Sequence, residues 1–421
     1  MWKGHRVPSR FTAGAERLCR AAAVLFAACC AAAGQTPGNA VSPSNSPRAP
    51  APQFAAFQAE LFTRIQAFAY NPAAAGVEAC ALHRTRLDLA LRPAPWISIR
   101  VRGEDSRALA FSGGERSRNP GELSLVQMRL NLGGGWAVGA GRQELSFGDE
   151  RLVGSDSEWG HIGARFDAVR LSWERRGLRI DAFLSSPVVP HARGWDPVAS
   201  GGSFHGVYAV WSGWNSGAAT DAYLLWKKGH TGGPAARRAT AGLRHVQPLG
   251  NRWGVATELA VQWGEEAMRP VRAWAGHLEA AVTLGGEPAA ARLIFEYNLA
   301  TGDDPATVAI ERFDDLYPAG HDAFALPDPV PWSDMQTAGA ILEWTAFRKW
   351  SFAAGGRSIG RTGGRGGRLL GWQASGFARW EFATGWQLCL SYSRMAAGAA
   401  AYYGGARHAF SVGVRRRIAG R

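Results

Sequence analysis

The sequence contains no apolar run of the roughly 18 residues that a membrane-spanning helix needs, so a helical membrane protein is excluded. Lysine and methionine are scarce, with four and five residues among 421, and arginine therefore carries nearly all of the positive charge behind the net +13. Cysteine is too sparse for a disulfide framework or a cysteine zinc site, because only Cys80 and Cys389 lie beyond residue 33. Glycine, with 53 residues, and tryptophan, with 18, are abundant instead. A GC-rich genome would produce part of this bias. The composition otherwise favours an outer-membrane barrel or a nucleic-acid-binding protein, which the pattern along the chain distinguishes.

The N-terminus has the three parts of a secretory signal. Five basic residues lie within positions 1–20, the apolar stretch AAAVLFAACCAAA follows at 21–33, and it ends in an A-x-A site at Ala31–Ala33. We therefore predict a Sec-type signal peptide over 1–33, cleaved near Ala33. Residues 34–53 are rich in proline and serine and are predicted to form a flexible leader. The folded part of the chain should be 54–421.

From about residue 54 onward, short segments alternate between polar and apolar residues. In HRTRLDLAL (83–91) the arginines and the aspartate share one face and the leucines share the other, and LSLVQMRLNL (123–132) repeats this pattern. A period of two is the signature of a β-strand. A soluble β-sandwich would alternate in the same way, with its polar residues facing water.

The placement of tryptophan favours the membrane. Trp253 and Trp263 lie on the apolar face of WGVATELAVQW, ten residues apart. At about 3.3 Å per residue and a tilt near 40°, this spacing is roughly 25 Å along the membrane normal. That distance matches the apolar band between the two aromatic girdles of an outer-membrane barrel.

The number and spacing of the segments predict an all-β fold, a single antiparallel up-and-down transmembrane barrel of about 18 strands. The expected strands are 57–70, 80–92, 95–104, 122–132, 135–145, 165–175, 177–185, 203–212, 220–227, 237–247, 251–263, 273–284, 289–299, 333–345, 350–357, 370–381, 385–394 and 407–416. The first of them, FQAELFTRIQAF, is equally compatible with an amphipathic helix.

The connections alternate in length. Those after even-numbered strands are short, whereas those after odd-numbered strands are long and polar, including 105–121, 146–164, 186–202, 300–332 and 395–406. This alternation and an even strand count are typical of an outer-membrane barrel with both termini in the periplasm. The short turns should then be periplasmic and the long loops extracellular. A nucleic-acid-binding protein requires no such alternation, so no nucleic-acid partner is expected.

The sequence also resembles a known family, the alginate-export (alginate porin-like) proteins of Gram-negative outer membranes. The resemblance rests on GRQELSFGDERLVGS (141–155) and RFDAVRLSW (165–173), supported by YNLATGDD (297–304) and FDDLYPAGH (313–321). It implies an eighteen-stranded barrel whose electropositive lumen conducts an acidic polysaccharide outward. The motif residues predicted to form part of a constriction are Arg142, Gln143, Gly148, Asp149, Arg151 and Asp167.

Arginine on the polar faces of the strands is the feature that points to a substrate. If the apolar faces contact lipid, these arginines line the lumen, where rings of arginine favour anions. Guanidinium remains protonated and its planar fork matches a carboxylate, which suits a uronic-acid polymer. We expect about half of them to brace the wall in ion pairs, and the first three strands to hold a cluster with few acids. The predicted lumen set is Arg84, Arg86, Arg100, Arg102, Arg129, Arg170, Arg244 and Arg292.

Enzyme-like signals lack their structural context. The sequence GRSIG (356–360) fits a nucleophile elbow but ends a predicted strand and leads into RTGGRGGR, not a helix. The acidic pairs at 149–150 and 303–304 lack EF-hand spacing, and the ten histidines lack zinc spacing. We predict no catalytic residue, no metal and no cofactor.

Two other functions stay open at this stage. One is a general or solute-uptake porin for small anionic substrates, and the other is a barrel enzyme or adhesin that acts through its long loops. The expected partners are outer-membrane lipids, an anionic polysaccharide or oligosaccharide, periplasmic export proteins and the barrel-assembly machinery.

Overall fold

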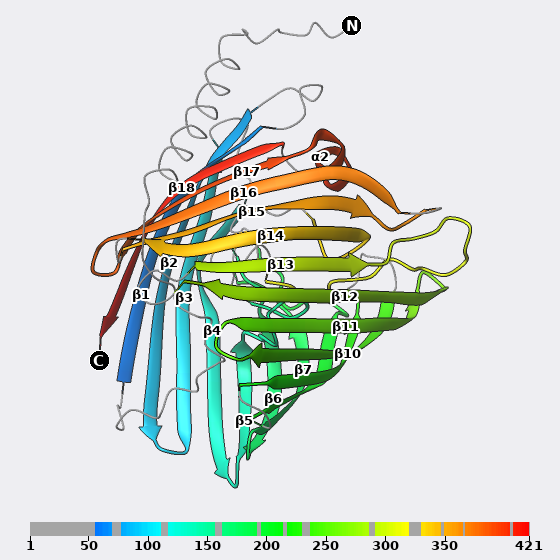
Figure 1. Ribbon diagram of the computed structural model, residues 1–421. Coiled ribbons are helices and arrows are strands. Elements are labelled where there is room, and N and C mark those ends of the chain that lie inside the picture. The colour runs from blue at the N-terminus through cyan, green and yellow to red at the C-terminus, as the bar shows by residue number, and fades with distance from the viewer. Residues whose placement is uncertain are drawn as a thin grey trace, which may run out of the picture.

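A computed structural model describes residues 55–420, apart from 70–76, 111–116, 156–161, 192–194, 214–216, 230–235, 286–290, 320–329, 347–348, 365–366 and 405–406. The predicted signal peptide and leader lie outside these residues. The described chain forms one eighteen-stranded antiparallel sheet that closes into a barrel (Figure 1). Among the residues that the structure describes, no helix is long and apolar enough to cross a bilayer.

Each strand pairs with its neighbours in the sequence, and closure pairs the first strand with the last. The strands are β1 (Ala55–Ala69), β2 (Val77–Ala94), β3 (Ile97–Ala110), β4 (Ser117–Gly133), β5 (Trp136–Gln143), β6 (Phe166–Arg175), β7 (Leu178–Pro187), β8 (Ser203–Ser212), β9 (Ala219–Lys228), β10 (Ala236–Leu249), β11 (Trp253–Glu266), β12 (Arg269–Leu284), β13 (Ala291–Ala300), β14 (Met335–Ala346), β15 (Trp350–Arg361), β16 (Arg368–Ala383), β17 (Trp386–Met395) and β18 (His408–Gly420). One short helix, α2 (Ala397–Tyr403), lies between β17 and β18. Eighteen strands are confirmed, and β1 is a strand, not a helix.

The strands are apolar outside and polar inside, the reverse of a soluble sandwich. On β1, Leu61 and Ile65 are 44% and 52% exposed, whereas the residues that precede them, Glu60 and Arg64, are buried. Trp253 and Trp263 both project outward from β11. An apolar outer face is stable only against lipid, because a contiguous exposed surface of this size would aggregate in water.

Two of the connections that were expected to be long are short in the structure. β3 and β4 continue past the apolar band, so the connection predicted over 105–121 shrinks to 111–116. β11 and β12 are likewise joined by only Ala267 and Met268, whose φ angles of 49° and 63° suit a two-residue hairpin turn. The prediction ended each strand where apolar alternation stopped. Backbone pairing continues beyond that point, supported by polar contacts such as that of the Gly121 amide of β4, which donates to the Asp105 carboxylate of β3 at 3.1 Å.

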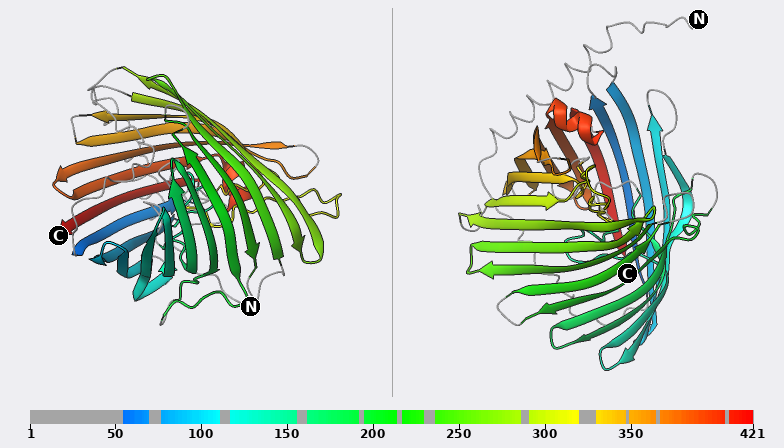
Figure 2. Two further views of the ribbon diagram at one scale, coloured as in Figure 1. Left: turned by 90° about the horizontal axis from the view of Figure 1, so that it is seen from below. Right: turned by 90° about the vertical axis from the view of Figure 1, so that its right-hand side faces the viewer.

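The hydrophobic core lies inside the barrel. Parts of the connections after β5 and β13 turn inward, so that Phe147 and Phe313 are buried with Phe166 and Phe204 of the strands. Isolated bridges join Phe147 to Val153 and Val153 to Tyr317, which ties the two inward segments together. The right-hand view in Figure 2 shows part of the yellow segment after β13 within the ring of strands. Parts of these long connections therefore fill part of the lumen.

Candidate functional site: the lumen wall and its inner loop

All eight arginines of the predicted lumen set lie on the inner face of the barrel. Arg129 of β4, for example, alternates with Val126 and Met128, which are more than 40% exposed on the outer face. Arg170 of β6 alternates in the same way with Val169 and Leu171, which also face outward. The placement follows from the period-two pattern, because neighbouring side chains of a strand project to opposite faces.

Barrel closure adds two arginines that the sequence pattern did not supply. β18 pairs with β1 in a register that sets Arg417 opposite Glu60, and the Arg417 Nε donates to Glu60 Oε2 at 3.0 Å. The Arg84 Nη2 donates to the other Glu60 oxygen at 2.8 Å, and Arg415 stacks over the Phe62 ring at 4.4 Å. The alternation in VRRRI (414–418) could have assigned Arg415 and Arg417 to one face. It could not have shown that this face lies beside β1.

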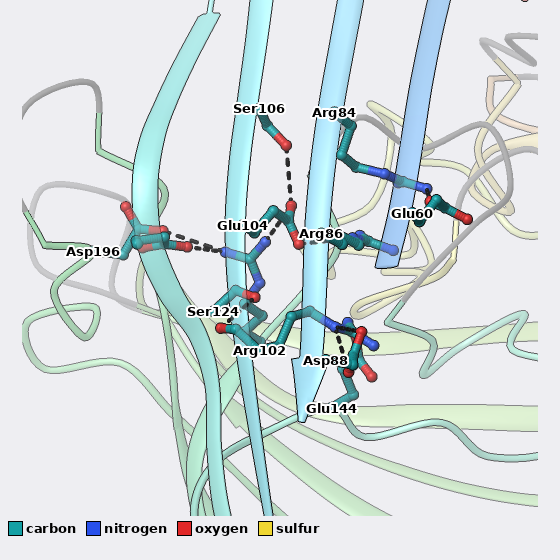
Figure 3. Close-up of polar contacts among 12 residues, drawn as sticks. Glu60, Arg84, Arg86, Asp88, Arg102, Glu104, Ser106, Ser124, Glu144 and Asp196 are labelled. Carbon is teal, nitrogen blue, oxygen red and sulfur yellow. Dashed lines mark hydrogen bonds and ion pairs between the residues drawn. The ribbon is translucent and has the colours of Figure 1, made fainter. Parts of the chain in front are cut away.

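The cluster on β2 and β3 contains more acids than the sequence suggested. Arg86 donates to Glu104 at 2.8 Å, and Glu104 also binds Arg165, which pairs with Glu122. The expectation of few acids was wrong, because carboxylates come from β1, β4 and the segment after β5 as well as from β2 and β3. Figure 3 shows Glu60, Arg84, Arg86 and Glu104 along neighbouring strands.

Arg100 and Arg102 converge on two carboxylates. Both donate to Asp88, at 2.9 Å each, and Arg102 also donates to Glu144 at 2.5 Å. The Arg102 side chain is only 7% exposed, whereas that of Arg100 is 45% exposed. Arg102 therefore braces the wall, and Arg100 keeps a guanidinium face toward the lumen.

We call the inner face of β18, β1, β2 and β3 the basic wall. It carries seven arginines against the carboxylates of Glu60, Glu78, Asp88 and Glu104, with Glu144 added by the segment after β5. The seven are Arg64, Arg84, Arg86, Arg100, Arg102, Arg415 and Arg417. The guanidiniums outnumber the carboxylates, so the wall keeps a positive field despite its ion pairs, and a guanidinium with five N–H donors can also donate to a second anion.

The remaining arginines of the lumen set lie on other strands. Arg170 and Arg179 share Asp181 at 2.8 Å each, Arg244 binds Asp221 at 3.2 Å, and Arg292 binds Glu279 at 2.9 Å. Arg129 makes no hydrogen bond or ion pair with any residue that the structure describes, and it lies in the field of Arg170 and Arg179.

Residues 144–155, the inner loop, cross the lumen. At one end Glu144 binds Arg102 of β3, and at the other Arg151 donates to Glu296 and Asn298 of β13 at 3.4 and 3.2 Å. β3 and β12 are opposite each other in an eighteen-stranded ring, and Arg151 also contacts His277 of β12 at 3.3 Å. Gly148, Asp149 and Arg151, three residues of the predicted constriction, lie on this segment.

The middle of the inner loop packs on aromatic and ionic groups of the wall. Phe147 stacks on Tyr208 at 4.5 Å, and the Arg170 guanidinium lies 5.1 Å from the Phe147 ring. Asp149 accepts from Arg151 at 3.1 Å. Burial disfavours the charged carboxylate, but the guanidinium groups of Arg151 and Arg244 outweigh this effect and lower the pKa of Asp149. The pair therefore stays ionised at neutral pH.

The other motif residues fix the base of the inner loop. Arg142 of β5 donates to Asp167 of β6 at 2.8 Å, directly across the strand pair. Gln143 is fully buried and donates to the Ala168 carbonyl at 2.9 Å. These contacts hold the β5–β6 pair at the point where the inner loop departs.

Gly148 allows the inner loop to lie against the wall. Its φ is +62°, and a Cβ there would come within 2.9 Å of the Tyr208 hydroxyl and 3.3 Å of Arg244 Cδ. Gly148→Val is expected to cost roughly 1–3 kcal/mol of local stability, from the left-handed backbone and the contact with Tyr208.

Hydrogen exchange of the inner loop measures this effect. We expect faster exchange over 145–154 in Gly148→Val. The shift in electrophoretic mobility on heating, which reports a folded barrel, should be unchanged. Gly134→Val is the matched control, since it has a φ of +60° in a β4–β5 turn and only Trp136 near its Cβ. Equal exchange in the wild type and Gly148→Val would contradict the assigned role of Gly148.

A second inward segment, residues 301–319, supports the inner loop. The Gly154 amide donates to the Tyr317 carbonyl at 2.8 Å, and Lys227 of β9 binds Asp314 at 2.9 Å. Asp303 accepts from the amides of Glu311 and Arg312 at 2.9 and 3.0 Å, which folds the TGDD turn. The motifs that carried the family resemblance therefore build the two segments inside the barrel.

Asp315 makes the packing of this second segment depend on pH. Burial and the neighbouring Asp314 carboxylate raise the pKa of Asp315 to about 6. A raised pKa in the folded state means that the stabilising contribution is complete below the ordinary pKa near 3.8 and is lost as the pH rises through about 6. We expect amides of 312–318 to be better protected at pH 5 than at pH 7.5, once corrected for intrinsic exchange. Asp315→Asn should remove the difference, and an unchanged difference in that variant would exclude Asp315 as its source.

The enzyme-like signals gain no support from the geometry. Ser358 lies within β15 and donates to the Ala338 carbonyl at 3.2 Å, a strand contact with no helix after it. Within the described ranges, no group of three or more His, Cys, Asp or Glu side chains is placed to hold a metal ion.

Comparison with known proteins places this geometry in a family. The alginate export family matches residues 81–358, about two thirds of the chain, including both inward segments. The chain belongs to the alginate export family. No curated protein matches it.

Solved structures show the fold that this alginate export family member adopts. OccAB1 of Acinetobacter baumannii aligns with a TM-score of 0.63 at 12% identity, covering 87% of this chain and 96% of that one. OpdQ of Pseudomonas aeruginosa gives 0.61 at 11% identity, covering 87% and 99%. OccK2 (OpdF) of the same organism, solved in complex with glucuronate, gives 0.59 at 13% identity, covering 87% and 96%. The chain is thus an outer-membrane porin-like β-barrel.

Proposed function

We propose that this protein is an anion-selective outer-membrane porin that conducts an acidic polysaccharide or oligosaccharide, with uronates as the substrate class. The observation that carries the proposal is the basic wall, seven arginines on four adjacent strands facing the lumen. The extracellular placement of the long-loop end, signal cleavage near Ala33 and export as the direction belong to the same proposal.

A bracing role alone does not account for the arrangement. Arg100 and Arg417 keep 45% and 47% of their side chains exposed although each contacts a carboxylate. Arg129 contributes a further cation on β4. Several partly hydrated guanidiniums give repeated weak sites, which admit an anionic chain and also release it. OccK2 was solved with glucuronate, and this supports a uronate as the chemical class.

The opposite side of the lumen is less basic. Glu258, Glu279 and Glu296 line β11 to β13, and Arg151 and Arg292 balance them only in part. A field therefore runs across the constriction from the basic wall to this face. A flexible polyanion would follow the basic wall, and the inner loop would keep it there.

Uptake of small anionic solutes is the second candidate. The inner loop narrows the lumen, and this favours small solutes over a polymer. The distinction depends on whether the loop stays in place as a chain passes. The barrel enzyme or adhesin has no supporting observation in the described residues.

The reversal potential of the purified wild type in a planar bilayer tests the proposal. With a tenfold KCl gradient, the current should reverse on the side of the chloride equilibrium potential. Glucuronate in place of chloride should still carry current. Reversal on the side of the potassium equilibrium potential would overturn the proposal of anion selectivity.

A further inference from the structure

The outer surface of β9 to β12 carries a group of basic residues close to the end of the barrel that bears the connections after odd-numbered strands. Lys228, Arg237 and Arg272 are exposed on the outer face, alternating with the buried or inward Lys227, Arg238 and Val271. Lys228 and Arg237 are direct cross-strand partners. Among the described residues none of the three basic side chains forms a hydrogen bond or ion pair, although Glu265 faces Arg237 across the β10–β11 pair. We call these three residues the outer basic cluster.

A row of tryptophans lies directly below this cluster. Trp226 and Trp263 flank Ala239 across the β9–β10 and β10–β11 pairs, and Trp263 is the cross-strand partner of Arg272. Ala239 points outward but is only 8% exposed, because it lies between the two indole side chains. Aromatic residues at this height mark the boundary between headgroups and acyl chains. The outer basic cluster therefore lies at the level of lipid headgroups.

An apolar groove continues from the tryptophans toward the middle of the membrane. It has a volume of about 600 Å³ and is lined by Val207, Leu224, Ala241, Leu243, Leu259 and Val261. A second hollow shares Leu259 and Val261 with it and reaches Trp263, Arg272 and Trp274. The small side chain of Ala241 leaves the groove open between bulkier neighbours. From Arg237 to Leu243 the strand covers about 20 Å, the scale of a headgroup and the first part of an acyl chain.

We infer that the outer basic cluster and the groove bind a phosphorylated, multiply acylated glycolipid of the outer leaflet. Three cations without a hydrogen-bond or ion-pair partner among the described residues are complementary to a headgroup with more than one phosphate, and the groove accepts an acyl chain. Lys and Arg beside a membrane surface attract anionic lipids, and guanidinium forms bidentate contacts with phosphate. The leaflet rests on the proposed extracellular placement of the loop end, whereas binding itself does not.

Binding of diphosphoryl hexa-acyl lipid A to the purified barrel in detergent, measured by native mass spectrometry, tests this inference. The variant K228E/R237E/R272E should bind at least about tenfold more weakly, since each basic residue contributes to headgroup attraction. The control R92E/R175E/R252E makes the same change of charge on exposed residues at the opposite end of the barrel, where the short turns lie, and should bind lipid A like the wild type. Ala241→Phe should also weaken binding, because it fills the groove without changing the charge.

Wild-type affinity for lipid A in K228E/R237E/R272E, or an equal loss of affinity in the control variant, would overturn the inference. Competition by phosphatidylglycerol as strong as that by lipid A would also overturn it. So would complete displacement of lipid A by millimolar pyrophosphate, which would indicate a simple phosphate site. Heat-modified mobility verifies folding, and K228Q/R237Q/R272Q replaces the charge reversal if that variant does not fold. Because the outer basic cluster is outside the lumen, the reversal potential should not change in any of these variants. Failure here and failure of the proposed function are therefore separate results.

Discussion

Replacing residues 148–152 by Gly-Gly is expected to raise the single-channel conductance by at least about twofold, because the shortened loop blocks less of the lumen that an eighteen-stranded barrel encloses. Phe147 and Val153 already form an antiparallel bridge, with the Phe147 amide donating to the Val153 carbonyl at 2.9 Å. A two-residue glycine turn can therefore close the shortened loop. The change removes Asp149 and Arg151, and with them the contact to β13.

Planar-bilayer recording of purified protein measures the effect. Arg151→Ala, which detaches the loop from β13 and leaves its length intact, should give a smaller increase and noisier open-channel current. Heat-modified mobility confirms that each barrel has folded. Conductance equal to the wild type in the shortened variant would show that the inner loop does not limit ion flow.

Replacing Arg100 and Arg417 together by glutamate is expected to shift the pore from anion toward cation selectivity. Both side chains are about half exposed on the basic wall. Their carboxylate partners keep other guanidiniums, since Asp88 retains Arg102 at 2.9 Å and Glu60 retains Arg84 at 2.8 Å. The barrel should therefore fold.

The size of this shift follows from Coulomb's law. Each unit charge about 10 Å from an ion in water changes the ion's energy by about 0.4 kcal/mol before screening. The double variant changes the wall by four charges, so the ratio of chloride to potassium permeability should fall roughly fivefold to tenfold. R237E/R272E carries the same change of charge on the outer face and should keep the wild-type reversal potential. An unchanged potential in R100E/R417E would remove the basic wall from the selectivity mechanism.

The strands and their inward faces could be predicted because both depend on local sequence. Alternation in 83–91 placed Arg84 and Arg86 on one face, and the structure keeps them there. The choice between strand and helix for residues 57–70 could not be made locally. It depends on β1 hydrogen-bonding with both β2 and β18, which are separated by more than 300 residues.

The partners of the arginines were not accessible for the same reason. Arg151 and Glu296 are 145 residues apart, and Arg417 and Glu60 are 357 apart. No spacing rule connects such positions. The family motif pointed to a constriction at the first inward connection, but the inward path of the second was hidden, because Phe313 sits within a polar connection that resembles an exposed loop. Apolar residues inside a predicted extracellular loop of a barrel are the signal that could have indicated inward packing.

Interruption of the chloride current by uronate oligomers tests the central claim most directly. The oligomer is added to one side of a bilayer that contains a single wild-type channel, and a neutral glucose oligomer of the same length is the control. The account predicts concentration-dependent blocking events with the uronate, longer in the wild type than in R100E/R417E, and few with the neutral oligomer. Equal block by both oligomers, or no block by the uronate, would contradict conduction of an acidic saccharide along the basic wall.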